Sequence, residues 1–147
     1  MSIGAGAAVL AACVVVPIPL PEDTVLAGKP VKSEDLAFLA AGSTTRDEVV
    51  ARFGQPDVFW EDKRIYAYDW DMRQGVLLWA VGGYPQAAGG IADIPKHYLF
   101  LIEFDEAWRV ERFARTTRPL TKSYAEFLLE WEKGGDEAWV AGRRALP

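Results

Sequence analysis

The sequence predicts an α+β fold in which two N-terminal helices pack on a three- to four-stranded antiparallel sheet, with an extra C-terminal amphipathic helix. Three observations favour this arrangement. Signals that start and stop helices come early in the chain, segments that alternate apolar and polar side chains follow them, and a helical apolar stripe returns near the end. Helices and strands that are segregated along the chain in this way are typical of α+β folds.

Two short helices are expected before the sheet. Ser33 can cap the first, with two acidic residues in its first turn, and Gly42 ends it. The second begins with a capping box, in which the hydroxyl of Thr45 accepts from the backbone N–H of Glu48 and the Glu48 carboxylate accepts from the N–H of Thr45. Gly54 suits the left-handed position just past the end of this helix.

The middle of the chain is expected to form the sheet. The candidate strands are Val58–Glu61, Arg64–Met72, Val76–Val81, His97–Asp105 and Arg109–Arg115. Between the third and the fourth of these, residues 82–95 contain four glycines and two prolines. This composition predicts a long loop.

A third helix is expected over Ser123–Lys133. Its apolar side chains Tyr124, Phe127, Leu128 and Trp131 follow the i, i+3, i+4, i+7 spacing of an amphipathic helix. The central strands are apolar on both faces, so both faces of the sheet need cover. We therefore expect the two early helices to cover one face and this helix to cover the other.

The only cysteine, Cys13, ends the run Leu10-Ala11-Ala12-Cys13, which has the form of a lipoprotein cleavage and acylation site. Residues 1–21 contain no charged side chain, and Pro17, Pro19 and Pro21 favour an extended spacer. The sequence thus predicts lipidation at Cys13. Two alternatives stay open: another secretory or anchoring signal, or a buried cysteine in a core strand of a cytosolic protein.

Composition and motif content exclude several classes of function. The net charge is −5 without a basic stripe, which opposes nucleic-acid binding. His97 is the only histidine, and we expect it to be structural or solvated rather than catalytic. Asp69 and Asp71 share one face of a strand, and we expect that face to be solvated rather than a cation site. No glycine-rich phosphate loop is present. We therefore expect no enzyme activity, no catalytic residue, no metal site and no cofactor.

A series of motifs runs from Gly42, through a threonine-rich cap and a valine-containing helix, to Gly54-Gln55-Pro56. Tyr66-Ala67-Tyr68 and a strand that ends at Asp105 follow. In this order the motifs resemble the SmpA/OmlA family of small outer-membrane lipoproteins, which includes the E subunit of the β-barrel assembly machinery. The resemblance covers residues 33–116. It implies two helices on a three-stranded antiparallel sheet and the role of a lipid-anchored scaffold that helps to maintain the envelope.

Together these observations predict four parts: a signal peptide (1–12), a lipidated proline-rich tether (13–32), an SmpA/OmlA-like domain (33–118) and a helical C-terminal extension (119–147). The expected function is a non-enzymatic scaffold on the periplasmic face of the outer membrane, held by acyl chains on Cys13. Its partners would be envelope proteins, with barrel-assembly components as candidates, and Trp79 and Tyr84 would anchor them. The alternative is a secreted inhibitor-like or ligand-binding module of the same fold.

Overall fold

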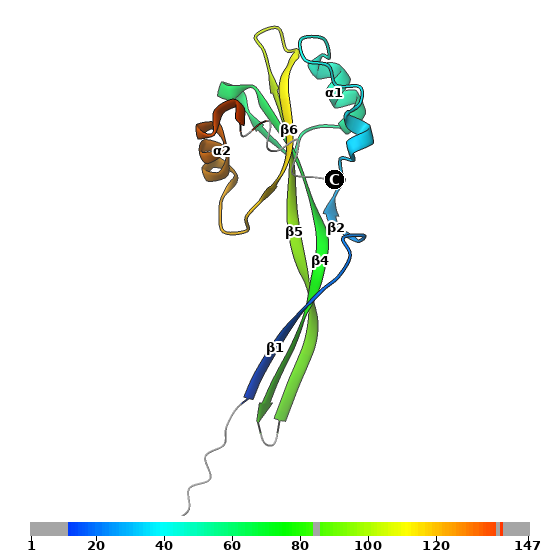
Figure 1. Cartoon of the computed structure of the whole chain (residues 1–147), viewed down its shortest axis with the longest axis vertical. Helices are drawn as coiled ribbons and strands as arrows, with labels where there is room; N and C mark the ends of the chain where they lie inside the picture. Colours follow the sequence, from blue (N-terminus) through cyan, green and yellow to red (C-terminus); the bar gives the residue numbers. More distant parts are fainter. Residues whose placement is uncertain (1–11, 84–85, 138, 140–147) are drawn as a thin grey trace, which may run out of the picture. The chain divides into compact units, whose positions relative to one another are not determined.

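A computed structural model of the chain describes residues 12–83, 86–137 and 139 (Figure 1). Strands make up about 51% of these residues, so the fold is mostly β. The expected α+β class is therefore wrong, and so is the expected pair of N-terminal helices on a three- to four-stranded sheet. A six-stranded antiparallel sheet takes their place.

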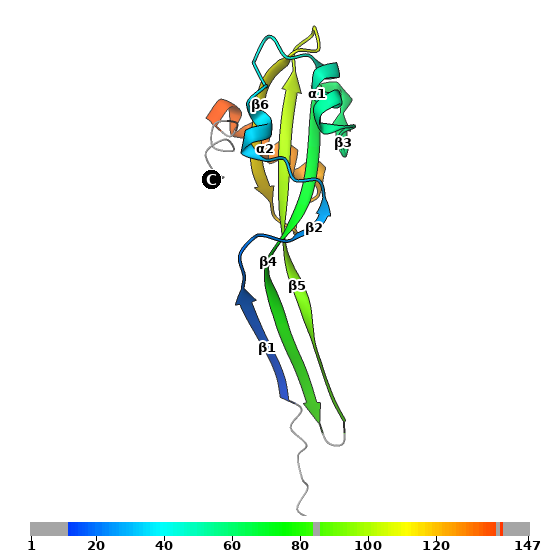
Figure 2. The same ribbon diagram turned by 90° about the vertical axis from the view of Figure 1, so that its right-hand side faces the viewer.

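Two long strands organise the sheet. β4 and β5 have 19 residues each and lie side by side (Figures 1 and 2). The strand order is β1-β4-β5-β6, and β2 and β3 also pair with β4. The strands are β1 Ala12–Pro19, β2 Val25–Gly28, β3 Val58–Trp60, β4 Ile65–Gly83, β5 Gln86–Phe104 and β6 Val110–Arg118.

The chain divides into two compact units, and β4 and β5 contribute residues to both. The smaller unit contains residues up to Thr24 together with Arg73–Pro95. The larger unit contains Val25–Met72 and the residues from Lys96 onward. The two units differ in how their apolar side chains are covered.

The larger unit has a core on each face of its sheet. One core gathers aromatic and aliphatic side chains from alternate positions of β4, β5 and β6 under the helix α1, Arg46–Phe53: Val49, Tyr66, Tyr68, Trp70, Tyr98, Phe100, Ile102, Phe104 and Val110. The other core contains the intervening positions under the helix α2, Tyr124–Lys133: Ile65, Ala67, Leu99, Leu101, Ala114, Phe127, Leu128 and Trp139. Figure 1 shows the two helices on opposite sides of these strands. The prediction that the C-terminal helix covers the second face is confirmed.

Of the two early helices, the first is only a single 3-10 turn, η1 Ser33–Leu36. The buried Thr44 gives the physical reason, because its hydroxyl accepts the N–H of Ala40 at 2.9 Å and donates to the carbonyl oxygen of Phe38 at 3.1 Å. An α-helix would need that Ala40 N–H for the carbonyl of Leu36. The second helix, α1, has the expected capping box of Thr45 and Glu48.

The smaller unit overturns two further expectations. The proline-rich segment expected to be a free tether is strand β1, which pairs with β4 from Ala12↔Gly82 to Pro19↔Gly75. The segment expected to be a long loop, residues 82–95, lies mostly in β4 and β5. Glycine is tolerated there because the indole of Trp79 lies across Gly90, where a Cβ would come within 3.0 Å of the indole nitrogen.

Candidate functional site

The smaller unit contains a three-stranded sheet whose apolar side chains are exposed or half-buried. We call it the apolar sheet; it consists of β1, residues 73–83 of β4 and residues 86–95 of β5. Val15 is 59% exposed and Ile91 is 70% exposed. Strands that are apolar on both faces are normally buried on both faces. Exposed apolar surface of this kind marks a site of interaction.

The register assigns the side chains of the apolar sheet to two faces, because paired residues in antiparallel strands point to the same side and successive residues alternate. One face, the aliphatic face, contains Val14, Val16, Ile18, Val76, Leu78 and Ile91. The other, the Trp79 face, contains Cys13, Val15, Pro17, Leu77, Trp79 and Val81. The two faces therefore have different chemistry: branched aliphatic side chains on one, and an indole and a thiol on the other.

Charge in the smaller unit is confined to one end of the sheet. Its charged residues are Glu22, Asp23, Arg73 and Asp93. The guanidinium of Arg73 lies 4.0 Å from the Asp23 carboxylate, 3.7 Å from the Asp93 carboxylate and 2.8 Å from the hydroxyl of Thr24. From Gln74 to Ala92 and from Met1 to Pro21 the sequence has no charged side chain. The rest of the apolar sheet thus presents an uncharged surface.

The outer edge of β1 is blocked against strand addition over half its length. The N–H of Leu20 donates to the carbonyl oxygen of Gln74 at 3.0 Å, so the even-numbered residues of this segment direct their N–H groups toward β4. Pro17 and Pro19 therefore stand on the outward-facing side, where they supply no donor. Proline on an edge strand opposes pairing with another chain. Over this half of the β1 edge, a partner therefore cannot extend the sheet by strand addition.

The area of one face of the apolar sheet limits the binding free energy that the face can supply. Eight residues at ~3.3 Å and three strands at ~4.7 Å give an area of roughly 370 Å². Removal of that area from water contributes at most about 9 kcal/mol. A stable protein–protein interface buries about 800 Å² on each partner. One face alone is thus less than half of a standard interface.

The structure brings two of the three predicted site residues onto one face. Cys13 is exposed, which excludes the buried-cysteine alternative for its side chain. Trp79 is 39% exposed and pairs across the strands with Val15, two residues from Cys13. Tyr84 lies outside the described residues. The aliphatic face was not predicted, although the uninterrupted apolar runs 14–16 and 76–81 were its sequence signal.

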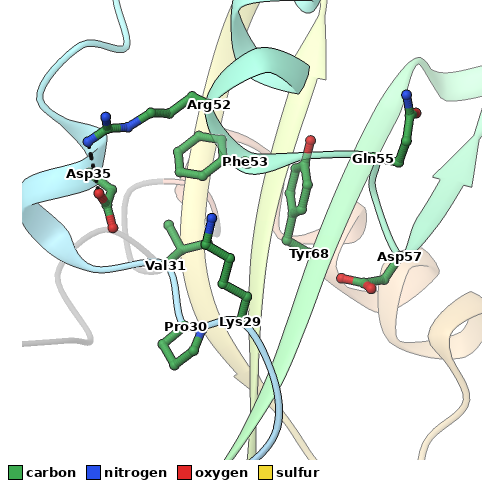
Figure 3. A pocket seen from close by; sticks show the side chains of 9 residues that line it. All are labelled: Lys29, Pro30, Val31, Asp35, Arg52, Phe53, Gln55, Asp57 and Tyr68. Carbon is green, nitrogen blue, oxygen red and sulfur yellow. Dashed lines mark hydrogen bonds and ion pairs between the residues drawn. The ribbon is translucent and has the colours of Figure 1, made fainter.

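A pocket in the larger unit is the second candidate site (Figure 3). It has a volume of about 380 Å³ and lies between the segment that follows β2, η1 and the end of α1. On its wall the Arg52 guanidinium is paired with the Asp35 carboxylate at 3.0 Å, and the hydroxyl of Tyr68 donates to the carbonyl oxygen of Gly54 at 2.9 Å. Burial raises the pKa of the Asp57 carboxyl.

The pocket combines polar and apolar groups in its lining. Lys29 and Gln55 contribute polar side chains, and Pro30, Val31 and Phe53 contribute apolar ones (Figure 3). A small ligand with both polar and apolar parts fits a lining of this kind.

His97, Asp71 and Asp69 are half-buried and partnered, so the expectation of a solvated carboxylate face is wrong. The His97 Nδ1 lies against the Asp71 carboxylate, and the hydroxyl of Tyr124 donates to Asp69. The guanidinium of Arg118 lies 4.4 Å from the centre of the Tyr124 ring. Within the described part of the chain, no three His, Cys, Asp or Glu residues are grouped so as to hold a metal ion. These contacts attach the start of α2 to the sheet.

Comparison with protein-family models, with curated proteins and with solved structures finds no match. Among the described residues, no helix combines the length and the apolar character needed to cross a membrane.

Proposed function

We propose that the protein is a lipid-anchored, non-enzymatic scaffold of the cell envelope that binds another protein. The observation that supports this proposal is the apolar sheet, because soluble monomers rarely expose uncharged, apolar faces of this kind. The acylation motif at Cys13 places the sheet next to a membrane. The resemblance to SmpA/OmlA supports an envelope role, with barrel-assembly components as candidate partners, although the fold it implied is corrected above.

The aliphatic face is the part of the sheet that suits a protein partner. Its Val, Ile and Leu side chains are typical of sheet faces that pack against another apolar surface at about 10 Å. An area of roughly 370 Å² gives a weak interface. Attachment of both proteins to one membrane raises their effective concentration, so a weak interface is sufficient for a scaffold.

Two measurements test the proposal. Palmitate labelling of the wild type against Cys13→Ala should label only the wild type. A photo-crosslinking amino acid at Ile91, on the aliphatic face, should capture a defined envelope protein, whereas the same group at Leu129, which is 54% exposed on α2, should not. The absence of label together with soluble protein in the periplasm would refute the anchored scaffold.

The second candidate function is a ligand-binding module, and the 380 Å³ pocket favours it. The inhibitor-like alternative loses its basis, because it assumed two helices packed on a three-stranded sheet and the structure does not have that fold. A secreted ligand-binding protein would give no palmitate label and no crosslink from Ile91. Lys29→Ala would then alter ligand affinity, whereas in a scaffold it would leave partner capture unchanged.

A further inference from the structure

We propose that the Trp79 face of the apolar sheet lies on the membrane lipid itself, as a second attachment beside the acyl chains at Cys13. This inference rests on the membrane location and the acylation site proposed above. The face itself is apolar whether or not Cys13 is modified, so its contact with lipid can be tested without acylation. The fold thus adds a protein surface to the contact that the acyl chains make.

The position of Cys13 identifies lipid as the occupant of this face. Cys13 pairs with Val81 and shares the face with Val15 and Trp79. An acyl chain attached to the sulfur starts from this face, so lipid reaches it before a protein partner can. The Cys13 end of the sheet is also free of charge, whereas Arg73 and its acidic partners lie at the opposite end.

The area of the face favours lipid over a second copy of the chain. Roughly 370 Å² per copy is well below the ~800 Å² that each partner of a stable dimer buries. A membrane surface has no such threshold, because it adapts to the shape laid on it. An apolar sheet face next to the acylated residue adds buried apolar area to the attachment that the acyl chains provide.

Trp79 has the chemistry and the geometry of a membrane-interface residue. A Cβ at Gly90 would lie 3.0–3.1 Å from the indole nitrogen, Cε2 and Cζ2, so the ring packs over this glycine, while Trp79 remains 39% exposed. Tryptophan is enriched where one part of the side chain meets hydrocarbon and the N–H meets water. The unpaired backbone groups on the outer edge of β1 remain at the level of the headgroups, because the sheet lies on the surface and does not enter the hydrocarbon.

The face also determines which lipids it recognises. It has no basic side chain, and the chain as a whole carries a net charge of −5. Attraction to anionic lipids therefore contributes nothing. We expect binding to neutral phosphatidylcholine vesicles that is insensitive to salt.

The test compares two neighbouring valines on opposite faces. The full chain with Cys13→Ser, which cannot be acylated, is mixed with phosphatidylcholine vesicles, and the bound fraction is measured by flotation. On this background Val15→Lys changes the Trp79 face, and Val16→Lys is the matched control on the aliphatic face. The two valines are 59% and 44% exposed on one strand. Val15→Lys should weaken partitioning at least about tenfold, and Val16→Lys less than about threefold.

Equal effects of the two substitutions, or no binding by the Cys13→Ser chain, would overturn the proposal. So would a dimer that forms without vesicles and that Val15→Lys dissociates, because a second copy would then cover the face. If Val15→Lys does not fold, brominated phosphatidylcholine gives an independent readout: it should quench fluorescence more in the Cys13→Ser chain than in the same chain with Trp79→Phe. Equal quenching counts against the proposal. None of these outcomes changes the palmitate labelling of the wild type. Failure of the lipid-contact proposal would therefore not refute the lipid-anchored scaffold.

Discussion

The packing of α2 predicts a large effect on stability when one of its buried side chains is truncated. Leu128 is 2% exposed and lies in the core with Leu99 and Leu101. Leu128→Ala removes three carbons, which loses about 2 kcal/mol of transfer free energy, and leaves a cavity that adds to the loss. We expect the free energy of unfolding to fall by about 3–4 kcal/mol, within the range measured for buried leucines. That is a large part of the 5–15 kcal/mol that typically stabilises a domain.

Urea unfolding followed by tryptophan fluorescence measures this loss, and Leu129→Ala is the control. Leu129 is the next residue of α2 but is 54% exposed, so its truncation should cost less than about 0.5 kcal/mol. A cost below about 1 kcal/mol for Leu128→Ala, similar to that of its neighbour, would refute the reasoning. The second face of the sheet would then be uncovered in solution.

Three further predictions follow from local geometry. Gly28→Ala should destabilise by more than about 2 kcal/mol in thermal unfolding, because Gly28 has a φ of +72° and an added Cβ would lie 2.4 Å from the carbonyl oxygen of Asp69. Thr45→Ala should lower the free energy of unfolding by about 1 kcal/mol. Hydrogen bonds from Thr45 lower the pKa of Glu48, so part of the stability difference between wild type and variant should vanish in acid, as pH falls through that lowered pKa. Burial and the bond to Asp69 raise the pKa of Tyr124 to about 12, so the wild type should lose stability relative to Tyr124→Phe as pH rises from 10 to 12 in alkaline denaturation.

The sequence predicted the elements that depend on local signals. The Thr45–Glu48 capping box and the apolar stripe of Ser123–Lys133 are local signals, and both helices lie where these signals predict them. The early 3-10 turn could not be predicted in this way. The chain after Leu36 is shaped by contacts with β6, since Val110 exchanges backbone hydrogen bonds with Gly42 and Thr44 at 2.7 and 2.8 Å.

Two strand segments of the smaller unit, β1 and the start of β5, were not predicted, because they contain proline and glycine, which usually oppose strand formation. Pro17 and Pro19 favoured a spacer, yet both stand on an edge where no donor is needed. Gly89 and Gly90 favoured a loop, yet the indole of Trp79 fills the space above Gly90. In each case the feature that lets a strand accept the proline or glycine lies on another strand or on the solvent side. The local sequence therefore does not show it.

The candidate site was predicted in part for a related reason. Trp79 and Cys13 were identified one at a time, by residue type and by motif. Their shared face follows from the pairing of Val15 with Trp79, 64 residues further along the chain. The apolar run 76–81 was assigned to a covered core, because a strand that is apolar on both faces is normally buried.

The pairing of β1 has a consequence for the order in which the chain can fold. Its partners on β4 lie between 56 and 70 residues later in the sequence. Contacts so distant form slowly, because the loop must close before the pairing stabilises it. β1 is also the first strand to be synthesised, so an apolar, uncharged segment waits without its partner until the chain has extended well past Gly82. During synthesis this uncovered apolar segment is therefore prone to aggregation.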